Sequence, residues 1–378
     1  MNDRLLGRLF HPFAAVATFF VLGGITVQQG ASAMPLEISL NALLEIDPHD
    51  LVTIDPGKVV EKCTIYLSAP EHRSRPEKYK LHLLRGYAYL YKDQFKEAVQ
   101  DFDEVVKLRP KNDFDSIFIR NSALGNQSRS GNSELLMQAK AGAEDLIRMK
   151  PDSAKAYLNM AMCLIAVGDF KGSIAYCDKS IALRGDNSGP YYTRGVAHKW
   201  NGEYQEALED LDKCIKLGSY GAGLKAAADP FIMRAELLLD PFDDPGRALS
   251  DLNMAHHINP TSFTVQFWSW YWYFKQGKYE IADFLSQRLT KEHPERSMST
   301  LASIATLIQK RNLDDALKLA ESMVSQAPKL AYGYYLRGVT RFAKGEYDSA
   351  IKDYDKAAKL HENNYHRRGA KAYLLASV

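Results

Sequence analysis

The sequence predicts an all-α protein built as an α-solenoid, a stack of about eight helix pairs, and three observations lead to this fold class. Small residues recur along most of the chain with successive separations of 34 or 41, which is a period of 34 with two insertions of seven. Apolar residues around them follow helical spacing, and prolines often stand twelve residues after them. The small residues are Ala98, Ala139, Ser173, Ala207, Ala248, Ala282, Ala316 and Ala350.

Length and composition agree with an elongated array of repeats. A chain of 378 residues exceeds what one compact core usually holds, and 46% hydrophobic with 25% charged residues is typical of globular material. The formal charge of +2 is near balance. It gives no electrostatic indication of a nucleic-acid partner.

Residues 1–33 have the pattern of a secretory signal peptide. Arg4 and Arg8 precede the short apolar run 13–27, and Ala31, Ser32 and Ala33 form a small-x-small cleavage site. Fifteen apolar residues fall short of the roughly 20 that span a bilayer, although an uncleaved anchor at 13–27 is the alternative. We therefore expect a periplasmic or secreted protein cleaved near Ala33, with membrane contact only through this segment if it is retained.

The remaining elements follow in order along the chain. Residues 34–78 contain apolar helical fragments that indicate an N-terminal helical cap or a degenerate half repeat. Four repeats are expected in 79–217 and four more in 229–362, with an inter-repeat linker or hinge at 218–228. Residues 363–378 repeat the R-G-x-A rhythm of earlier first helices, so they are expected to form a C-terminal capping helix.

Each pair is expected to cross at its small residues. In the first pair Phe95, Ala98, Val99 and Phe102 recur at i, i+3, i+4 and i+7, which makes one stripe of an amphipathic helix. Glycine or alanine stands twelve residues before the small residue in four pairs, with Gly86 facing Ala98 in the first. One pair cannot bury its stripe alone, so neighbouring pairs must share it.

A period of 34 with glycine, alanine and proline at these offsets resembles the tetratricopeptide repeat family, over about residues 79–376. The segments 84–110 and 334–360 carry the resemblance most clearly. It implies a right-handed superhelix whose first helices face a concave groove. The family's carboxylate clamp is matched only in fragments, by Lys155 and Asn159.

The stretch FWSWYWYF, residues 267–274, lies on the first helix of the sixth repeat. Two interpretations compete: the rings pack in the core, or the stripe at i, i+4 and i+7 faces the groove, as the family resemblance implies. An apolar, aromatic groove suits extended or helical peptides. The candidate ligand-binding residues are Tyr87, Ile117, Tyr192, Phe267, Tyr271, Phe274, Tyr335 and Phe342.

Little in the sequence indicates catalysis or a cofactor. His256 and His257 are adjacent on a helix and so point to different sides, unlike the i, i+4 pair of a zinc site. No hydrolase elbow, phosphate loop or metalloprotease motif occurs. The four cysteines match no metal or redox spacing, and buried thiols are expected, with one disulfide still possible. We therefore expect no enzyme, no cofactor and no metal.

Three functions from different classes are compatible with this scaffold. The first is a protein-protein interaction scaffold that binds a protein or peptide of unknown identity in the groove, in envelope assembly, secretion or quality control. The second is a binder of cell-envelope polysaccharide, because stacked aromatic faces also suit sugars. The third is a self-associating structural protein, in which the aromatic residues form a homo-oligomer interface.

Overall fold

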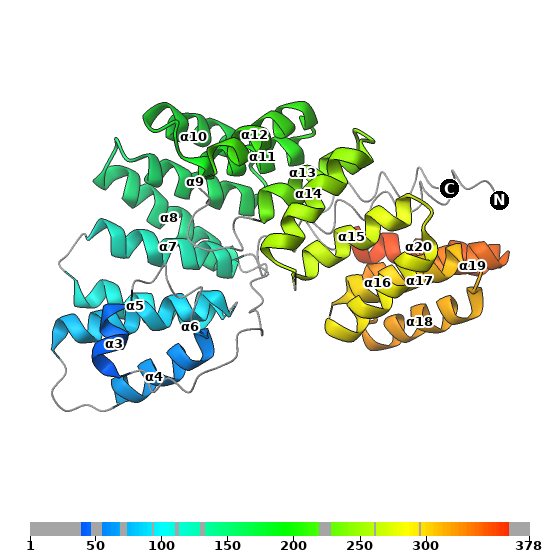
Figure 1. Ribbon diagram of the computed structural model, residues 1–378, viewed down its shortest axis with the longest axis horizontal. Helices are drawn as coiled ribbons and strands as arrows, with labels where there is room; N and C mark the ends of the chain where they lie inside the picture. Colours follow the sequence, from blue (N-terminus) through cyan, green and yellow to red (C-terminus); the bar gives the residue numbers. More distant parts are fainter. Residues whose placement is uncertain are drawn as a thin grey trace. The chain divides into compact units, whose positions relative to one another are not determined.

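The computed structural model describes residues 39–46, 55–68, 74–92, 94–109, 113–128, 133–218, 228–260, 262–294 and 296–362. Within these ranges the chain forms 18 helices and no strand, so the all-α solenoid is confirmed (Figure 1). The helices are α3 (Leu40–Glu45), α4 (Pro56–Ser68), α5 (Arg75–Tyr91), α6 (Phe95–Leu108), α7 (Phe114–Ser128), α8 (Ser133–Met149), α9 (Ala154–Val167), α10 (Phe170–Leu183), α11 (Ser188–Asn201), α12 (Tyr204–Leu217), α13 (Asp229–Leu239), α14 (Pro245–Ile258), α15 (Phe263–Lys275), α16 (Tyr279–Glu292), α17 (Ser297–Gln309), α18 (Leu313–Gln326), α19 (Ala331–Lys344) and α20 (Tyr347–Glu362).

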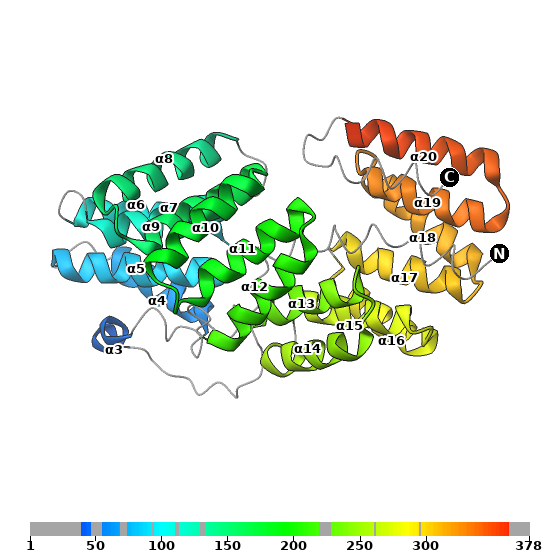
Figure 2. The ribbon, with the colours of Figure 1, turned by 90° about the horizontal axis from the view of Figure 1, so that it is seen from above.

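The described chain divides into two compact units. The N-terminal unit runs to Arg234 and the C-terminal unit begins at Ala235, so the boundary falls inside α13. Odd-numbered helices from α5 to α19 are the first helices of pairs, and the even-numbered helices that follow them are the second helices. Figure 2 shows successive helices lying side by side within each unit, as in α9 with α10 and α19 with α20.

Small residues sit where the helices of a pair cross, as the period of 34 predicts. All eight are almost fully buried, from Ala98 to Ala350. A Cβ added at Gly195 would lie 3.3 Å from the Ala207 carbonyl oxygen, so a side chain there would crowd the crossing. A Cβ added at Gly86 would lie 2.6 Å from Phe102 Cε1, so the Phe102 ring packs directly on this glycine.

Glycine in the left-handed region connects the two helices of several pairs. Gly168, Gly202, Gly277 and Gly345 all have positive φ, which glycine adopts without a steric penalty. The same turn of the seventh pair places Arg311 at φ 64°. The backbone of Arg311 is therefore in a conformation that costs free energy for any residue with a Cβ atom.

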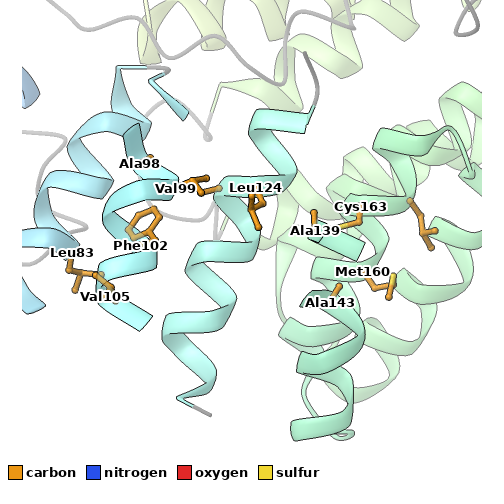
Figure 3. Close-up of a cluster of buried hydrophobic side chains, with 12 residues drawn as sticks. Leu83, Ala98, Val99, Phe102, Val105, Leu124, Ala139, Ala143, Met160 and Cys163 are labelled. Carbon is orange, nitrogen blue, oxygen red and sulfur yellow. The ribbon is translucent and has the colours of Figure 1, made fainter. Parts of the chain in front are cut away.

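The core of the N-terminal unit is continuous from pair to pair (Figure 3). Phe102 and Val105 of α6 belong to the same buried cluster as Leu124 of α7 and Met160 of α9. At the start of the unit, Leu43 of α3 and residues of α4 form a second cluster with α5, where the sequence indicates a cap or half repeat. The stripe of one pair is thus buried by its neighbours.

Three expectations concern residues outside those that the structure describes. They are the signal peptide at 1–33, the capping helix at 363–378 and most of the linker at 218–228. Among the described helices, none combines the length and apolar character needed to cross a membrane.

Candidate functional site

The aromatic stretch of α15 is a core element of the C-terminal unit. Phe267, Tyr271 and Phe274 are only 1%, 3% and 5% exposed, and Trp268 and Trp270 are buried as well. The expectation that the first three rings lie open along a groove is therefore wrong. Its physical reason is that the helix is apolar around its whole circumference, which is typical of a helix enclosed on all sides.

Three aromatic residues of α15 form hydrogen bonds through their polar atoms. Trp270 donates from Nε1 to Thr306 Oγ1 of α17 at 3.0 Å, and Tyr271 donates its hydroxyl to Asp240 Oδ2 at 2.7 Å. Trp272 Nε1 donates to the Pro245 carbonyl oxygen at 2.8 Å. Such bonds satisfy groups that would otherwise be costly to bury. The rings thus hold α15 to the helices around it.

The last pair contains the two remaining candidates of this unit. Tyr335 is buried, and its ring lies 5.9 Å from the Tyr354 ring. Burial raises the pKa of the Tyr335 phenol well above its usual value. Phe342 is half-buried and meets the Tyr347 ring edge-on at 5.4 Å. Phe342 therefore keeps an accessible surface, whereas Tyr335 belongs to the core.

In the N-terminal unit the candidates remain partly accessible. Tyr87, Ile117 and Tyr192 are half-buried residues on first helices. Other half-buried apolar residues accompany them on α7 and α9. We call the whole set the first-helix strip; its members are Tyr87, Ile117, Phe118, Leu158, Met162, Ile165 and Tyr192.

Contacts join the three first helices α7, α9 and α11, which carry most of the strip. Lys155 of α9 places its ammonium 5.9 Å from the Phe118 ring centroid of α7. Asn121 donates to Asn159 Oδ1 at 2.5 Å, which bonds the same two helices inside the core. A Cβ added at Gly189 of α11 would lie 3.2 Å from Leu158 Cδ2. Because Asn159 accepts this bond from Asn121, its amide is used within the fold. A carboxylate clamp would require a free amide at this position.

Paired arginine and aspartate residues inside three helix pairs were missed by sequence reasoning. Each arginine stands just before the small residue of the first helix, and each aspartate three residues after the small residue of the second. The aspartates are almost fully buried and accept two bonds from one guanidinium, which is the strongest geometry for this pair. The pairs are Arg85–Asp101, Arg194–Asp210 and Arg337–Asp353. A repeated arginine-to-aspartate separation of sixteen was the available signal.

A second set of ion pairs joins neighbouring helix pairs. In each case an acid five residues after the small residue of a second helix meets an arginine of the following first helix. Arg194 reaches Asp178 at 2.5 Å, Arg234 reaches Asp212 at 2.7 Å, and Arg341 reaches Glu321 at 3.5 Å. Arg120 bonds Asp103 in the same way. We call these acids the socket acids.

A pocket of about 260 Å³ lies among α4, α5 and α6. His82 Nδ1 lies 2.8 Å from Asp101 Oδ1, and Arg85 also reaches Thr64 Oγ1 at 3.1 Å. The buried carboxylate is thus shared by two partners on α5. These groups bond to one another, so the network fastens three helices together.

All four cysteines are buried thiols that form no disulfide. Burial raises the pKa of Cys63, Cys177 and Cys214 to about 12. Because the thiolate is the reactive form, these sulfurs are poor nucleophiles at neutral pH. Within the described residues no group of three or more His, Cys, Asp or Glu side chains is placed to hold a metal ion.

Comparison with known families identifies the repeats. Tetratricopeptide repeat models match residues 79–112, 154–187, 189–217 and 331–364. Human mitochondrial import receptor subunit TOM70 is 32% identical over 135 residues, covering 35% of this chain and 22% of that protein. Hsp70-Hsp90 organizing protein 2 of Arabidopsis thaliana is 22% identical over 228 residues, covering 52% of this chain and 40% of its own length. The matched segments thus span about a fifth of the length of TOM70 and two fifths of the length of the organizing protein.

Solved structures show the same architecture. The crystal structure of the APC/C hetero-tetramer Cut9-Hcn1 superposes with a TM-score of 0.61 at 12% sequence identity. The superposition covers 91% of this chain and 64% of that chain. At this identity the likeness establishes the fold alone.

Proposed function

Because the chain belongs to the tetratricopeptide repeat family, we propose that it is a non-catalytic scaffold that binds a protein or peptide along the first-helix strip. Proteins of this family generally mediate protein-protein interaction. The named roles of two relatives, an import receptor subunit and an organizing protein for Hsp70 and Hsp90, also involve protein partners. These roles support protein binding as the function of this chain. The identity of its partner has to be found by experiment.

The observation that carries the proposal is the partial exposure of the strip. Its aromatic and aliphatic side chains are half-buried on four successive first helices of one unit. Apolar surface that stays accessible in a folded domain is typical of an interaction site. Aromatic side chains contribute contact area to a bound peptide at little conformational cost.

The rings of α15 take no part in this proposal, because they are enclosed. Phe342 of α19 is retained as a candidate contact in the C-terminal unit, since it is half-buried. We further propose that the protein acts outside the cytoplasm, in envelope assembly, secretion or quality control. The basic start, short apolar run and small-x-small site within residues 1–33 support this location.

The test is capture of partners from the cell envelope of the source organism. Residues 34–378 are immobilised as wild type and as the double variant Tyr87→Ala plus Tyr192→Ala. The matched control is Tyr204→Ala plus Phe284→Ala, which removes two exposed rings from second helices. Helicity by circular dichroism confirms that each variant is folded.

We expect the strip variant to lose the partners that wild type and control both retain. A loss on the order of tenfold in affinity corresponds to about 1.4 kcal/mol, a modest share of two aromatic contacts. If the folded strip variant keeps every partner, the first-helix strip is not the binding surface.

A further inference from the structure

The pocket of about 260 Å³ among α4, α5 and α6 lies at positions where other helix pairs hold a lysine against a ring. In the third and fourth pairs a tyrosine stands sixteen residues before the small residue, and a lysine stands six residues after it. Lys179 Nζ lies 5.8 Å from the Tyr157 ring centroid, and Lys213 Nζ lies 6.0 Å from that of Tyr191. Each of these two pairs thus supplies its own ammonium group at these positions.

The first pair carries different residues at the same two positions. His82 stands in place of the tyrosine and Glu104 in place of the lysine, and both line the pocket. The change removes a phenol ring and a lysine stem, so space is left between the helices. It also reverses the charge at the second position. The pocket is therefore open at the place where the fourth pair holds the ammonium of Lys213.

Carboxylates outnumber cations on the walls of the pocket. Three acids of α6, four and three residues apart, share the side of the helix that lines it: Glu97, Asp101 and Glu104. Arg85 is the arginine of the lining, and it is already bound to Asp101 through two hydrogen bonds. Two carboxylates are thus left without a permanent cation inside the pocket. Such a surplus of negative charge favours a cationic ligand.

The two remaining carboxylates are accessible. Glu97 is half-buried and makes no hydrogen bond or ion pair among the residues that the structure describes. Glu104 accepts a bond at Oε1 from Lys107, whose side chain is 68% exposed, and such solvated pairs are weak. The half-buried ring of Tyr89 adds an aromatic wall. Together these groups offer a cation two acceptors and a π face.

We propose that this pocket binds a primary ammonium group, such as the lysine side chain of a protein partner. Its volume lies below the roughly 300 to 1,000 Å³ of pockets for drug-sized ligands, so one side chain or a small free amine fits it. Thr64 and Gln100 of the lining are exposed, which places the mouth of the pocket at solvent. Arg85 and Tyr89 each stand two residues from Tyr87 and so lie on the opposite side of α5 from the first-helix strip.

Filling the pocket from within tests the proposal. The double variant His82→Tyr plus Glu104→Lys gives the first pair the residues of the fourth, so it is expected to fold, which circular dichroism of residues 34–378 checks. The probe is Nα-acetyl-lysine methylamide, and NMR of the amides in α5 and α6 follows its titration. We expect the double variant to bind the probe at least about tenfold more weakly than wild type. Glu144→Lys, a charge reversal at an exposed position of α8, is expected to leave binding unchanged.

A second variant changes the charge and leaves the pocket open. Glu97→Gln keeps the shape of the side chain, removes one carboxylate and is expected to weaken binding of the probe severalfold. Its matched control is Glu206→Gln, the same position in the fourth pair, where Tyr191 and Lys213 are present. This control is expected to bind as wild type does. Equal loss in both variants would contradict binding at the pocket of the first pair.

Probes that differ in one group identify the ligand chemistry. The norleucine counterpart of the probe lacks the ammonium group and is expected not to bind. Tighter binding of the lysine probe than of putrescine assigns the ammonium to a protein side chain, and the reverse order assigns it to a small free amine. Equal binding of the lysine and norleucine probes, unchanged binding by the double variant or no binding by wild type would overturn the proposal.

The result is independent of the first-helix strip. The strip variant Tyr87→Ala plus Tyr192→Ala is expected to bind the lysine probe as wild type does, because neither residue lines the pocket. A failure of the strip to capture partners would therefore leave this site in place, and a failure of the probe to bind would leave the strip in place.

Discussion

At the scale of single residues, buried aspartates fix the crossing of two helices. Asp210 is buried and accepts bonds at 2.9 and 2.7 Å from Nε and Nη2 of Arg194. The hydrogen bond to Asp210 raises the pKa of Arg194. His198 stands close to the same carboxylate, with Nε2 3.8 Å from Asp210 Oδ2. Removing the carboxylate would leave a guanidinium without its main acceptor.

Asp210→Asn is expected to lower the free energy of unfolding by about 2 to 3 kcal/mol. The loss lies below the range of a fully enclosed pair, because the Arg194 side chain stays 22% exposed. Chemical denaturation provides the measurement. The matched control is Asp186→Asn, which breaks the exposed pair with Arg184 and should change stability by less than about 0.5 kcal/mol. Equal losses of stability from both changes would show that the buried pair stabilises the fold no more than an exposed pair does.

Arg311 gives a prediction of the opposite sign. It has φ 64° in a turn where four equivalent positions, Gly168, Gly202, Gly277 and Gly345, hold glycine. Arg311→Gly removes the steric cost of the left-handed region and is expected to raise stability by about 0.5 to 1 kcal/mol. Thermal denaturation measures the change, with Arg311→Ala as the control that keeps a Cβ. A destabilised glycine variant would contradict the assignment.

Buried thiols make stability fall at high pH. The pKa of Cys63, Cys177 and Cys214 is about 12 in the folded chain, against 9.0 for an unburied thiol. Above about pH 9 the unfolded state loses these protons while the folded state keeps them, so stability declines as pH rises toward 12. The triple alanine variant should show a weaker decline between pH 8 and pH 10. A decline identical to that of wild type would argue that these thiols are not buried.

At the scale of elements, α15 shows what periodicity leaves undecided. Its stripe of Phe267, Tyr271 and Phe274 follows the spacing of an exposed helix face, and the sequence alone therefore permits a groove. Whether such a face is open depends on side chains far along the chain, here Thr306 of α17 and Asp240 before α14. A helix period reports which residues share a side and does not report what covers that side.

Phe267→Ala is expected to destabilise the C-terminal unit by about 3 to 5 kcal/mol, because a large cavity would remain in a packed core. Phe284→Ala is the matched control on α16, where the ring is 66% exposed, and its effect should stay within about 0.5 kcal/mol. Thermal denaturation compares the two. A Phe267→Ala variant as stable as the control would contradict the conclusion that the rings of α15 are buried.

At the scale of the whole molecule, the repeat period predicted the fold, because each buried small residue recurs at a helix crossing. Ala98, Ser173 and Ala316 all became fully buried, as the spacing requires. The candidate site was predicted less completely. Tyr87, Ile117 and Tyr192 kept accessible surface, whereas four rings in the C-terminal unit became buried. The ion pairs between neighbouring helix pairs were not foreseen, since their residues meet only after the pairs stack.

The central proposal is that a protein partner binds to the first helices and that binding, without catalysis, is the function. Hydrogen exchange of the full mature chain, alone and with a captured partner, tests it most directly. It predicts slower exchange of amides in α5, α7, α9 and α11 when the partner is bound, with exchange in the second helices unchanged. Protection confined to second helices, or a partner that is chemically altered by the chain, would contradict it.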